Sequence, residues 1–311
     1  MTESAEHEKQ AAALNSVMAA VLLAGLKVVV GLWSGSLGIL AEAAHSGLDF
    51  IAAVVTLLAV RAAGRPADAE HPYGHGKIEN LSALAEALLL LGTCAWIIRE
   101  SLERLANKQA HIEASVWAFA IMAISILVDI TRSRMLYRAA AKHHSQALEA
   151  DALHFRTDIW SSAVVIVGLI GVRAAGAFPA LGFLVKADAV AALGVAIIVV
   201  WVSVRLGFRT VQGLLDTAPA GVEDQVRAAA EAVPGVLDCH AIRIRHSGPR
   251  CFLDLHVVLE GSQTLESAHQ ITEHIEQAVQ AILPEADVTV HPEPIAAHPD
   301  RLKDKGGPGP I

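Results

Sequence analysis

The chain has 311 residues, of which 53% are hydrophobic and only 18% are charged. This balance, with a mean hydropathy of +0.45, exceeds what a soluble domain usually shows and indicates a protein that crosses a membrane several times. The net charge of −8 lies largely in the C-terminal part and argues against a nucleic-acid partner. Three cysteines cannot all pair in disulfides, and they are more consistent with a reducing cytosol than with a disulfide scaffold.

Six apolar stretches are long enough to cross about 30 Å of hydrocarbon as helices. They are expected at residues 12–33, 37–60, 79–99, 113–135, 150–172 and 187–205. Residues 1–11 carry acidic side chains and lack the basic region and cleavage site of a secretory signal. We therefore expect residues 1–11 to be a cytosolic tail and residues 12–209 to form a six-span, all-helical transport domain.

Lysine and arginine gather on one side of this six-span arrangement. The richer side holds Lys9, Arg61, Arg65, Lys77, Arg132, Arg134, Arg138, Lys142, Arg205 and Arg209. The opposite side holds Arg99, Arg104, Lys108, Arg173 and Lys186. By the positive-inside rule both termini are expected to be cytoplasmic.

Residues 210–295 are more polar than the preceding spans and contain several Pro and Gly residues. They predict a small cytosolic α/β domain. Helices are expected at residues 222–233 and 264–283, and strands at 237–245, 251–260 and 287–291. Ser247, Gly248 and Pro249 separate the first two strands and predict a hairpin. The order is therefore αββαβ, and the Pro- and Gly-rich sequence from Pro292 through the tail of residues 296–311 is expected to be disordered.

The second and fifth spans each contain a histidine followed four residues later by an aspartate. These pairs are His45 with Asp49 and His154 with Asp158. At this spacing the two side chains project from one face of a helix. An ionisable group at membrane depth costs about 2.5 to 3.5 kcal/mol, so four of them need mutual compensation or a cation. We interpret them as one buried metal site; the alternative is that each pair bonds a neighbouring helix.

The donor set of this site indicates which ion it binds. Two imidazoles and two carboxylates suit tetrahedral Zn²⁺, whereas thiolates would favour softer ions. Because the ligands must lose their protons to bind metal, and histidine ordinarily titrates near pH 6.5, protons and Zn²⁺ compete. The sequence therefore predicts exchange of metal for protons (antiport), with His45 and His154 as the proton carriers.

Other ionisable residues also fall within or beside the predicted spans. Lys27 would neutralise a carboxylate or reach toward the interface, with a structural role favoured. Asp129 would pair with the basic run after the fourth span or line a cytoplasmic cavity. Asp188 opens the sixth span, where an acid suits the helix dipole.

Three motifs together resemble the cation diffusion facilitator family, and the likeness covers nearly the whole chain. They are SGSLGILAEAAHSGLD at Ser34–Asp49, HPYGHGKIE at His71–Glu79 and HFRTD at His154–Asp158, with the αββαβ end. The resemblance implies a homodimeric six-span exporter of divalent transition metals with a metallochaperone-like cytosolic domain. It also implies a transport site at the four residues above. In the family, histidine at the position of His45 goes with a preference for zinc over cadmium, so export of Fe²⁺, Cd²⁺ or Mn²⁺ is the alternative.

The loop between the second and third spans holds a second candidate site. Asp68, His71 and His75 follow one another at spacings of three and four. The resemblance implies a further metal ion here, near the membrane surface; the alternative is a solvated loop with incidental histidines. The resemblance also implies that Lys77 forms an interlocking ion pair at the dimer interface with Asp216.

The cytosolic domain is rich in histidine. The resemblance implies a metal site at its dimer interface formed by His240, His256, His269, His291 and Glu293. Zn²⁺ there is expected to tighten the homodimer and to sense cytosolic zinc, because binding selects the associated state. His246 and His274 are interpreted as ordinary histidines, and Cys239 as pointing to the opposite face of its strand from His240.

An intramembrane metalloenzyme and a membrane-anchored metal sensor are rival interpretations. The sequence has no HExxH motif, and four protein ligands would fill a tetrahedral zinc ion, whereas catalytic zinc keeps a position open for water. A sensor would not need ligands at bilayer depth. We therefore expect a transporter and no enzyme. Vesicular animal relatives usually carry a long histidine-rich loop between spans four and five, and the short connection here favours a bacterial inner membrane.

Overall fold

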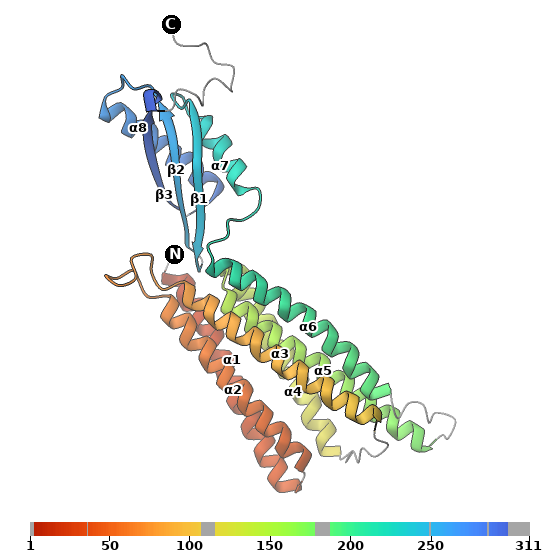
Figure 1. The fold of residues 1–311 in the computed structure, drawn as a ribbon. Helices are drawn as coiled ribbons and strands as arrows, with labels where there is room; N and C mark the ends of the chain where they lie inside the picture. The colour runs from red at the N-terminus through yellow and green to blue at the C-terminus, as the bar shows by residue number, and fades with distance from the viewer. Residues whose placement is uncertain are drawn as a thin grey trace. The chain divides into compact units, whose positions relative to one another are not determined.

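The computed structural model describes residues 3–35, 37–106, 116–177, 187–248, 250–284 and 286–297 (Figure 1). They divide into two compact units, the first ending at Val211 and the second beginning at Gln212. The predicted boundary, between residues 209 and 210, lies close to this division.

The described part of the first unit contains six long helices. They are α1 (Glu3–Ser34), α2 (Leu37–Ala63), α3 (Lys77–Ala106), α4 (Val116–His143), α5 (Gln146–Ala177) and α6 (Ala187–Leu214). Among the described residues, four stretches are long and apolar enough to cross a membrane. These are Ser4–Ser34, Glu42–Ala63, Lys77–Glu103 and Leu193–Leu214. Helix α1 already begins at Glu3, because the alanine, glutamate, lysine and glutamine residues of the N-terminal segment are strong helix formers.

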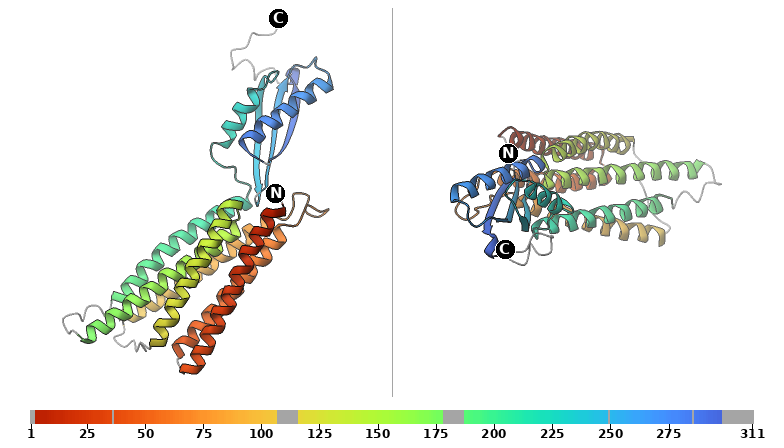
Figure 2. Two further views of the ribbon diagram at one scale, coloured as in Figure 1. Left: turned by 180° about the vertical axis from the view of Figure 1, so that it is seen from behind. Right: turned by 90° about the horizontal axis from the view of Figure 1, so that it is seen from above.

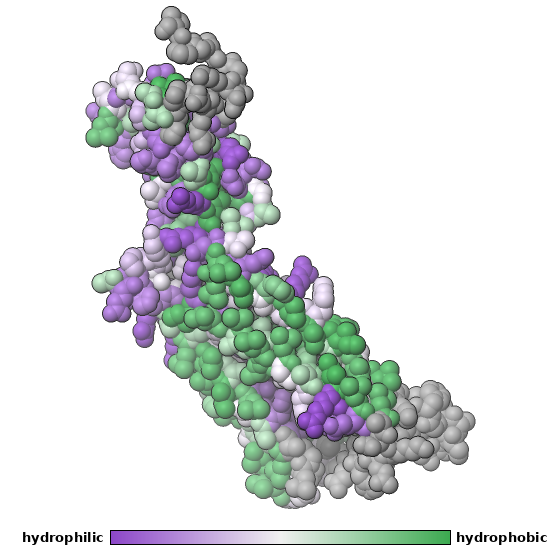
Figure 3. All heavy atoms as spheres, in the orientation of Figure 1, coloured by the Kyte–Doolittle hydropathy of each residue, from purple (hydrophilic) through white to green (hydrophobic). Residues whose placement is uncertain are grey.

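The helices run alongside one another as a bundle (Figure 2), and hydrophobic residues cover much of the visible face of that bundle (Figure 3). α1 packs along α2 and α4, and α5 packs along α4 and α3. Phe155, Leu136 and Leu148 form a buried core with Ala13 of α1 and Val60 of α2. This core holds α2 beside α5, the two helices that carry the predicted transport ligands.

The second unit has the predicted αββαβ order. Its elements are α7 (Val222–Glu231), β1 (Asp238–Ser247), β2 (Arg250–Leu259), α8 (Leu265–Ile282), β3 (Asp287–Pro294) and a short 3-10 helix, Ile295–Ala297. In the described residues the sheet order is β1-β2-β3, with β1 antiparallel and β3 parallel to β2. Val226 and Ala230 of α7 and Ile275 and Val279 of α8 share a core with the strands, so both helices cover one face of the sheet.

The third strand is longer than the sequence predicts. β3 continues to Pro294, so the expectation that disorder begins at Pro292 is wrong. β3 lies at an edge of the sheet, where a proline can be accommodated because its missing N–H costs no ladder hydrogen bond. Of the predicted tail, residues 298–311 lie outside the described part of the chain.

Candidate metal centres

The predicted transport ligands lie on two neighbouring helices. His45 and Asp49 are one turn apart on α2, and His154 and Asp158 are one turn apart on α5. Because a spacing of four residues returns to the same helix face, each helix presents one imidazole and one carboxylate in the same direction. The packing of α2 against α5 then brings the two pairs toward each other.

The four side chains converge. His154 Nε2 lies 3.3 Å from Asp49 Oδ1 and 3.5 Å from Asp158 Oδ2. His45 Nε2 lies 3.9 Å from Asp49 Oδ1. One ligand atom each from His45, Asp49 and Asp158 can be chosen so that all three lie within 4.8 Å of one another, a spacing that one metal ion can bridge. The His154 side chain is 3% exposed and that of His45 is 37% exposed, so the site is closed on the α5 side and partly open at His45.

A buried lysine lies beside the α2 ligands. Lys27 of α1 is only 4% exposed, and its Nζ donates to Ser46 Oγ at 2.8 Å and pairs with Glu42 Oε2 at 3.2 Å. Ser46 directly follows His45, so this contact ties α1 to the ligand-bearing turn of α2. The sequence left two roles open for Lys27, and its ion pair with Glu42 corresponds to the first, neutralisation of a carboxylate. Glu42 is not one of the predicted metal ligands.

The loop residues also come together. His71 Nδ1 and His75 Nε2 each lie 3.4 Å from a carboxylate oxygen of Asp68, and all three residues can offer ligand atoms within 4.8 Å. Asp68 Oδ1 accepts backbone hydrogen bonds from His71 at 2.7 Å and from Glu70 at 3.0 Å. These N–H groups, led by that of His71, hold the pKa of the Asp68 carboxyl below its ordinary value of 3.8. The loop therefore presents an ionised carboxylate between two imidazoles at neutral pH.

In the cytosolic unit, strand register assembles three histidines in one row. His240 of β1 pairs with His256 of β2, which pairs with His291 of β3. Paired residues on adjacent strands point to the same face of a sheet. Glu293 lies two residues beyond His291 on the same face, with its carboxylate 2.9 Å from His256 Nδ1 and 3.3 Å from His240 Nε2. The face opposite the helices thus carries a histidine cluster with a shared carboxylate.

One member of this cluster was not anticipated, and one predicted member lies elsewhere. Asp238 Oδ2 lies 3.2 Å from His240 Nδ1, and the alternation of β1 puts both on the cluster face while buried Cys239 joins the core. His291 Nε2 is 3.8 Å from Glu293 Oε1. His269 is on α8, 70% exposed and paired with Glu273, so a single chain does not bring it to the cluster. The period of two along β1 is the signal that could have found Asp238.

The remaining predicted residues have simpler surroundings. Lys77 is the first residue of α3, and Asp216 follows α6 with a left-handed φ of 58°. Asp129 pairs with Arg132 at 3.5 Å, and this arginine lies within the predicted fourth span rather than in the basic run after it. Asp188 lies in the first turn of α6, where the sequence places it.

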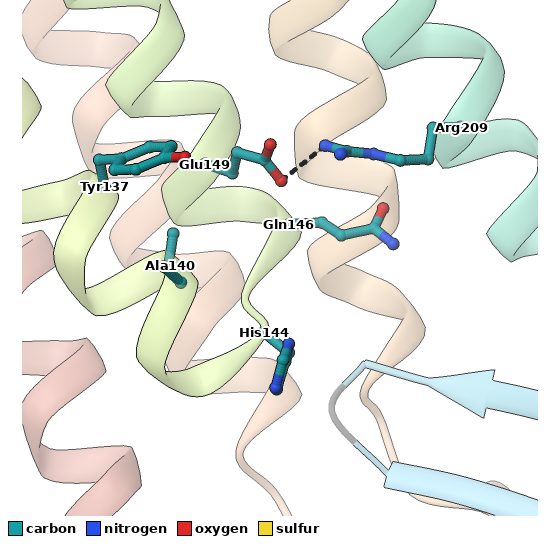
Figure 4. A pocket seen from close by; sticks show the side chains of 7 residues that line it. Tyr137, Ala140, His144, Gln146, Glu149 and Arg209 are labelled. Atoms are coloured by element: carbon teal, nitrogen blue, oxygen red, sulfur yellow. Dashed lines mark ion pairs between the residues drawn. The ribbon is translucent and has the colours of Figure 1, made fainter.

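A separate pocket of about 280 Å³ lies where α4, α5 and α6 meet. Its polar lining consists of Tyr137, His144, Gln146, Glu149 and Arg209 (Figure 4). Glu149 and Arg209 pair across it at 2.6 Å. Because its carboxylate is already engaged by a guanidinium, this pocket is not a metal site like the three clusters above.

Comparison with known proteins identifies the family to which this chain belongs. Residues 13–215 match the cation efflux transmembrane domain, and residues 218–295 match the cation efflux protein cytoplasmic domain. The cation-efflux pump FieF of Pectobacterium atrosepticum is 33% identical over 302 residues, which cover 94% of this chain and 95% of that protein. FieF of Yersinia enterocolitica is 32% identical over 293 residues, with coverages of 93% and 94%.

Solved structures include MamM-CTD 215-293, which is 30% identical and covers 24% of this chain and 94% of that chain, with a TM-score of 0.23. Both family domains lie in this chain in the same order as the two units of its fold. The chain therefore belongs to the cation diffusion facilitator family: it is a bacterial-type cation-efflux transporter with a dimerising cytoplasmic domain, and not an enzyme.

Proposed function

We propose that this transporter exports Zn²⁺ from the cytosol in exchange for protons, through a site made of His45, Asp49, His154 and Asp158. The observation that carries the proposal is the convergence of the four side chains from α2 and α5 inside the helical bundle. Two imidazoles and two carboxylates are a donor set that suits tetrahedral Zn²⁺. Fe²⁺, Cd²⁺ and Mn²⁺ are the alternative substrates on the same scaffold.

Proton exchange follows from the chemistry of these ligands. An imidazole binds metal only when its ring nitrogen is unprotonated, so each proton that binds His45 or His154 competes with the ion. If the helices open alternately to either side, protons from a more acidic exterior displace Zn²⁺ outward. They then leave to the cytosol before the next ion binds. His45 and His154 carry these protons, while Asp49 and Asp158 supply the counter-charge.

We place the transporter in a bacterial inner membrane with both termini in the cytosol. The second unit, which matches a cytoplasmic domain, follows directly on α6. An even number of crossings then returns the N-terminus to the same side, in agreement with the distribution of lysine and arginine. The relatives named above are bacterial proteins.

The loop and cytosolic clusters bind further Zn²⁺ ions in this proposal. The Asp68, His71 and His75 cluster combines an ionised carboxylate with two imidazoles. The cytosolic cluster is completed in a homodimer, with His269 supplied across the interface, and the pair of Lys77 with Asp216 fixes the register of the two copies. Metal at the cytosolic cluster stabilises the dimer by mass action and so responds to cytosolic zinc.

Zinc uptake into vesicles that contain the purified protein, under an imposed pH gradient, tests the proposal. We expect wild-type protein to accumulate Zn²⁺ and to move protons in the opposite direction. His45→Ala and His154→Ala should each abolish the coupled proton movement, while His144→Ala, outside all three clusters, should behave as wild type. Undiminished coupled transport in both of the first two variants would contradict the assignment.

A further inference from the structure

A second polar cluster lies inside the helical bundle, apart from the four predicted ligands. Its centre is Glu86 of α3 and Asp151 of α5, which are 4% and 0% exposed. Thr56 Oγ1 of α2 donates to Glu86 Oε1 at 2.6 Å. Ser16 Oγ of α1 donates to Asp151 Oδ2 at 3.2 Å. Four helices therefore hold these two carboxyl groups in fixed positions.

The two carboxyl groups lie on neighbouring helices and are incompletely bonded. Glu86 and Asp151 are adjacent in sequence to Ala87 and Ala150, which pack in one cluster where α3 meets α5. Glu86 Oε2 and Asp151 Oδ1 are both buried, and neither has a hydrogen-bond partner among the described residues. A buried carboxylate oxygen without a donor is costly, because it loses the water that would solvate its charge.

The arginine beside this pair acts on Asp151 rather than on Glu86. Arg132 of α4 is buried, and its guanidinium reaches Asp151 only through Ser16, to which it donates at 3.0 Å. The same guanidinium pairs with Asp129 at 3.5 Å. The guanidinium of Arg132 is thus shared between two buried carboxyl groups, those of Asp129 and Asp151. A buried carboxylate without a cationic partner is destabilising, and protonation removes its charge.

We propose that Glu86 and Asp151 together bind a proton at a site separate from the metal ligands, and that this proton is released during transport. On release the carboxyl O–H bond breaks, the proton passes to water and a carboxylate remains. The positive charge of a divalent ion arriving at the nearby transport site compensates that carboxylate, which couples ion entry to proton release. This second half of the proposal rests on the proposed antiport; the binding of the proton does not.

The occupant of this cluster is a proton because its donor set is poor for a transition metal. Both hydroxyl groups donate to the carboxyl groups, and among the described residues no imidazole or thiolate forms a hydrogen bond or ion pair with either acid. The groups of histidine and acidic residues that could hold a metal, among the described residues, are the three clusters already described.

Charged and polar groups of α1, α2, α4 and α5 surround the pair. Around Asp151 they include Arg132 of α4, His154 of its own helix, Ser16 of α1 and Asp49 of α2; around Glu86 they include Thr56, His154 and Asp158. Leu206 of α6 packs against Ala83, Ala87 and Ala150 on the adjoining turns of α3 and α5. The proposed proton therefore experiences the charge of the transport site without occupying any of its ligands.

Infrared spectroscopy of the full-length protein in lipid tests the first half directly, because a protonated carboxylic acid has a carbonyl band that an ionised carboxylate lacks. At neutral pH we expect a carbonyl band of a protonated carboxyl group whose proton exchanges slowly with solvent deuterium. This band should be lost in Glu86→Gln and in Asp151→Asn. Thr56→Val keeps both carboxyl groups and should shift the band, since it removes the donor to Glu86 Oε1. Glu149→Gln, a carboxylate on α5 that pairs with Arg209, is the matched control and should leave the band unchanged.

Vesicle assays on the same variants test the second half. We expect Glu86→Gln to bind Zn²⁺ with wild-type affinity, which also shows that it is folded, but to release fewer protons per zinc ion. A band that persists in both Glu86→Gln and Asp151→Asn overturns the proton site. A lost band with an unchanged proton-to-zinc ratio overturns its release during transport. Absence of proton counterflow in wild-type protein would instead refute the antiport, while the infrared result still decides the proton site.

Discussion

Lys9 and Glu79 form an ion pair of 2.8 Å in which each side chain is only 1% exposed. The pair joins the first turns of α1 to those of α3, across 70 residues of sequence. Ser145, in the turn between α4 and α5, donates its hydroxyl hydrogen to the other oxygen of Glu79. One buried carboxylate thus connects three parts of the helical bundle.

Replacing one partner of this pair should lower the free energy of unfolding far more than replacing both partners. Lys9→Ala leaves Glu79 as an uncompensated buried charge, and we expect a loss of about 3 to 5 kcal/mol in unfolding free energy. The double variant Lys9→Met with Glu79→Leu removes both charges and should recover most of that loss. Thermal unfolding of both variants in the same detergent measures the difference, and equal stability of the two would contradict the prediction.

His45 should influence which metal is selected. Replacing it by aspartate gives the site a third carboxylate, which can bind in a bidentate manner and suits a larger ion with more ligands. We expect His45→Asp to raise Cd²⁺ transport relative to Zn²⁺, as the family resemblance also implies. Uptake of both ions into vesicles measures the ratio. His144→Asp, in the turn between α4 and α5, provides a control in which the ratio should not change.

The backbone hydrogen bonds that Asp68 accepts in the loop site should persist from neutral to mildly acidic pH. The folded pKa of Asp68 is below 3.8, so the stabilisation from its ionised form is complete above that pH and is lost only as pH falls through the lowered value. We expect the Glu70 and His71 amides to keep their protection, after correction for intrinsic exchange rates, from about pH 7 to about pH 5. Hydrogen exchange measured by mass spectrometry tests this. Asp68→Ala should lose the protection at both pH values.

Removal of metal should loosen the cytosolic dimer. If Zn²⁺ at one hundred times its dissociation constant binds only the dimer, it stabilises the dimer by about 2.7 kcal/mol, and a chelator removes that contribution. We expect chelation to lower the dimer fraction of wild-type protein, measured by analytical ultracentrifugation. Glu293→Gln should already show the loosened state without chelator, because Glu293 contacts both His240 and His256. His246→Ala should respond to chelation as wild type does.

Local spacing explains what could be predicted from the sequence. The spacing of the two HxxxD pairs places each pair on one face of a helix, and of the two helices that carry them only α2 contains one of the four strongly apolar stretches found among the described residues. The αββαβ order followed from alternation and from Pro and Gly positions, and the structure has that order. The comparisons establish the family that the motifs indicated, whereas the roles of the individual metal ligands remain predictions.

Features that depend on distant partners could not be predicted. Glu79 and Glu86 belong to α3, but their hydrogen-bond partners come from α1, α2 and the turn before α5, and no sequence period links these positions. The extension of β3 through Pro292 was missed because proline ordinarily disfavours strand. Only the sheet order shows that β3 is an edge strand, where that penalty is small.

Pro292 and Pro294 have a consequence for how the cytosolic domain meets other molecules. An edge strand normally offers free N–H groups on which a foreign strand can assemble, but a proline offers none. At the other edge, β1 is interrupted by a register shift between His240 and Arg243. Both features disfavour the pairing of a strand from another molecule with an edge of this sheet. Association of the domain through side-chain contacts is favoured instead.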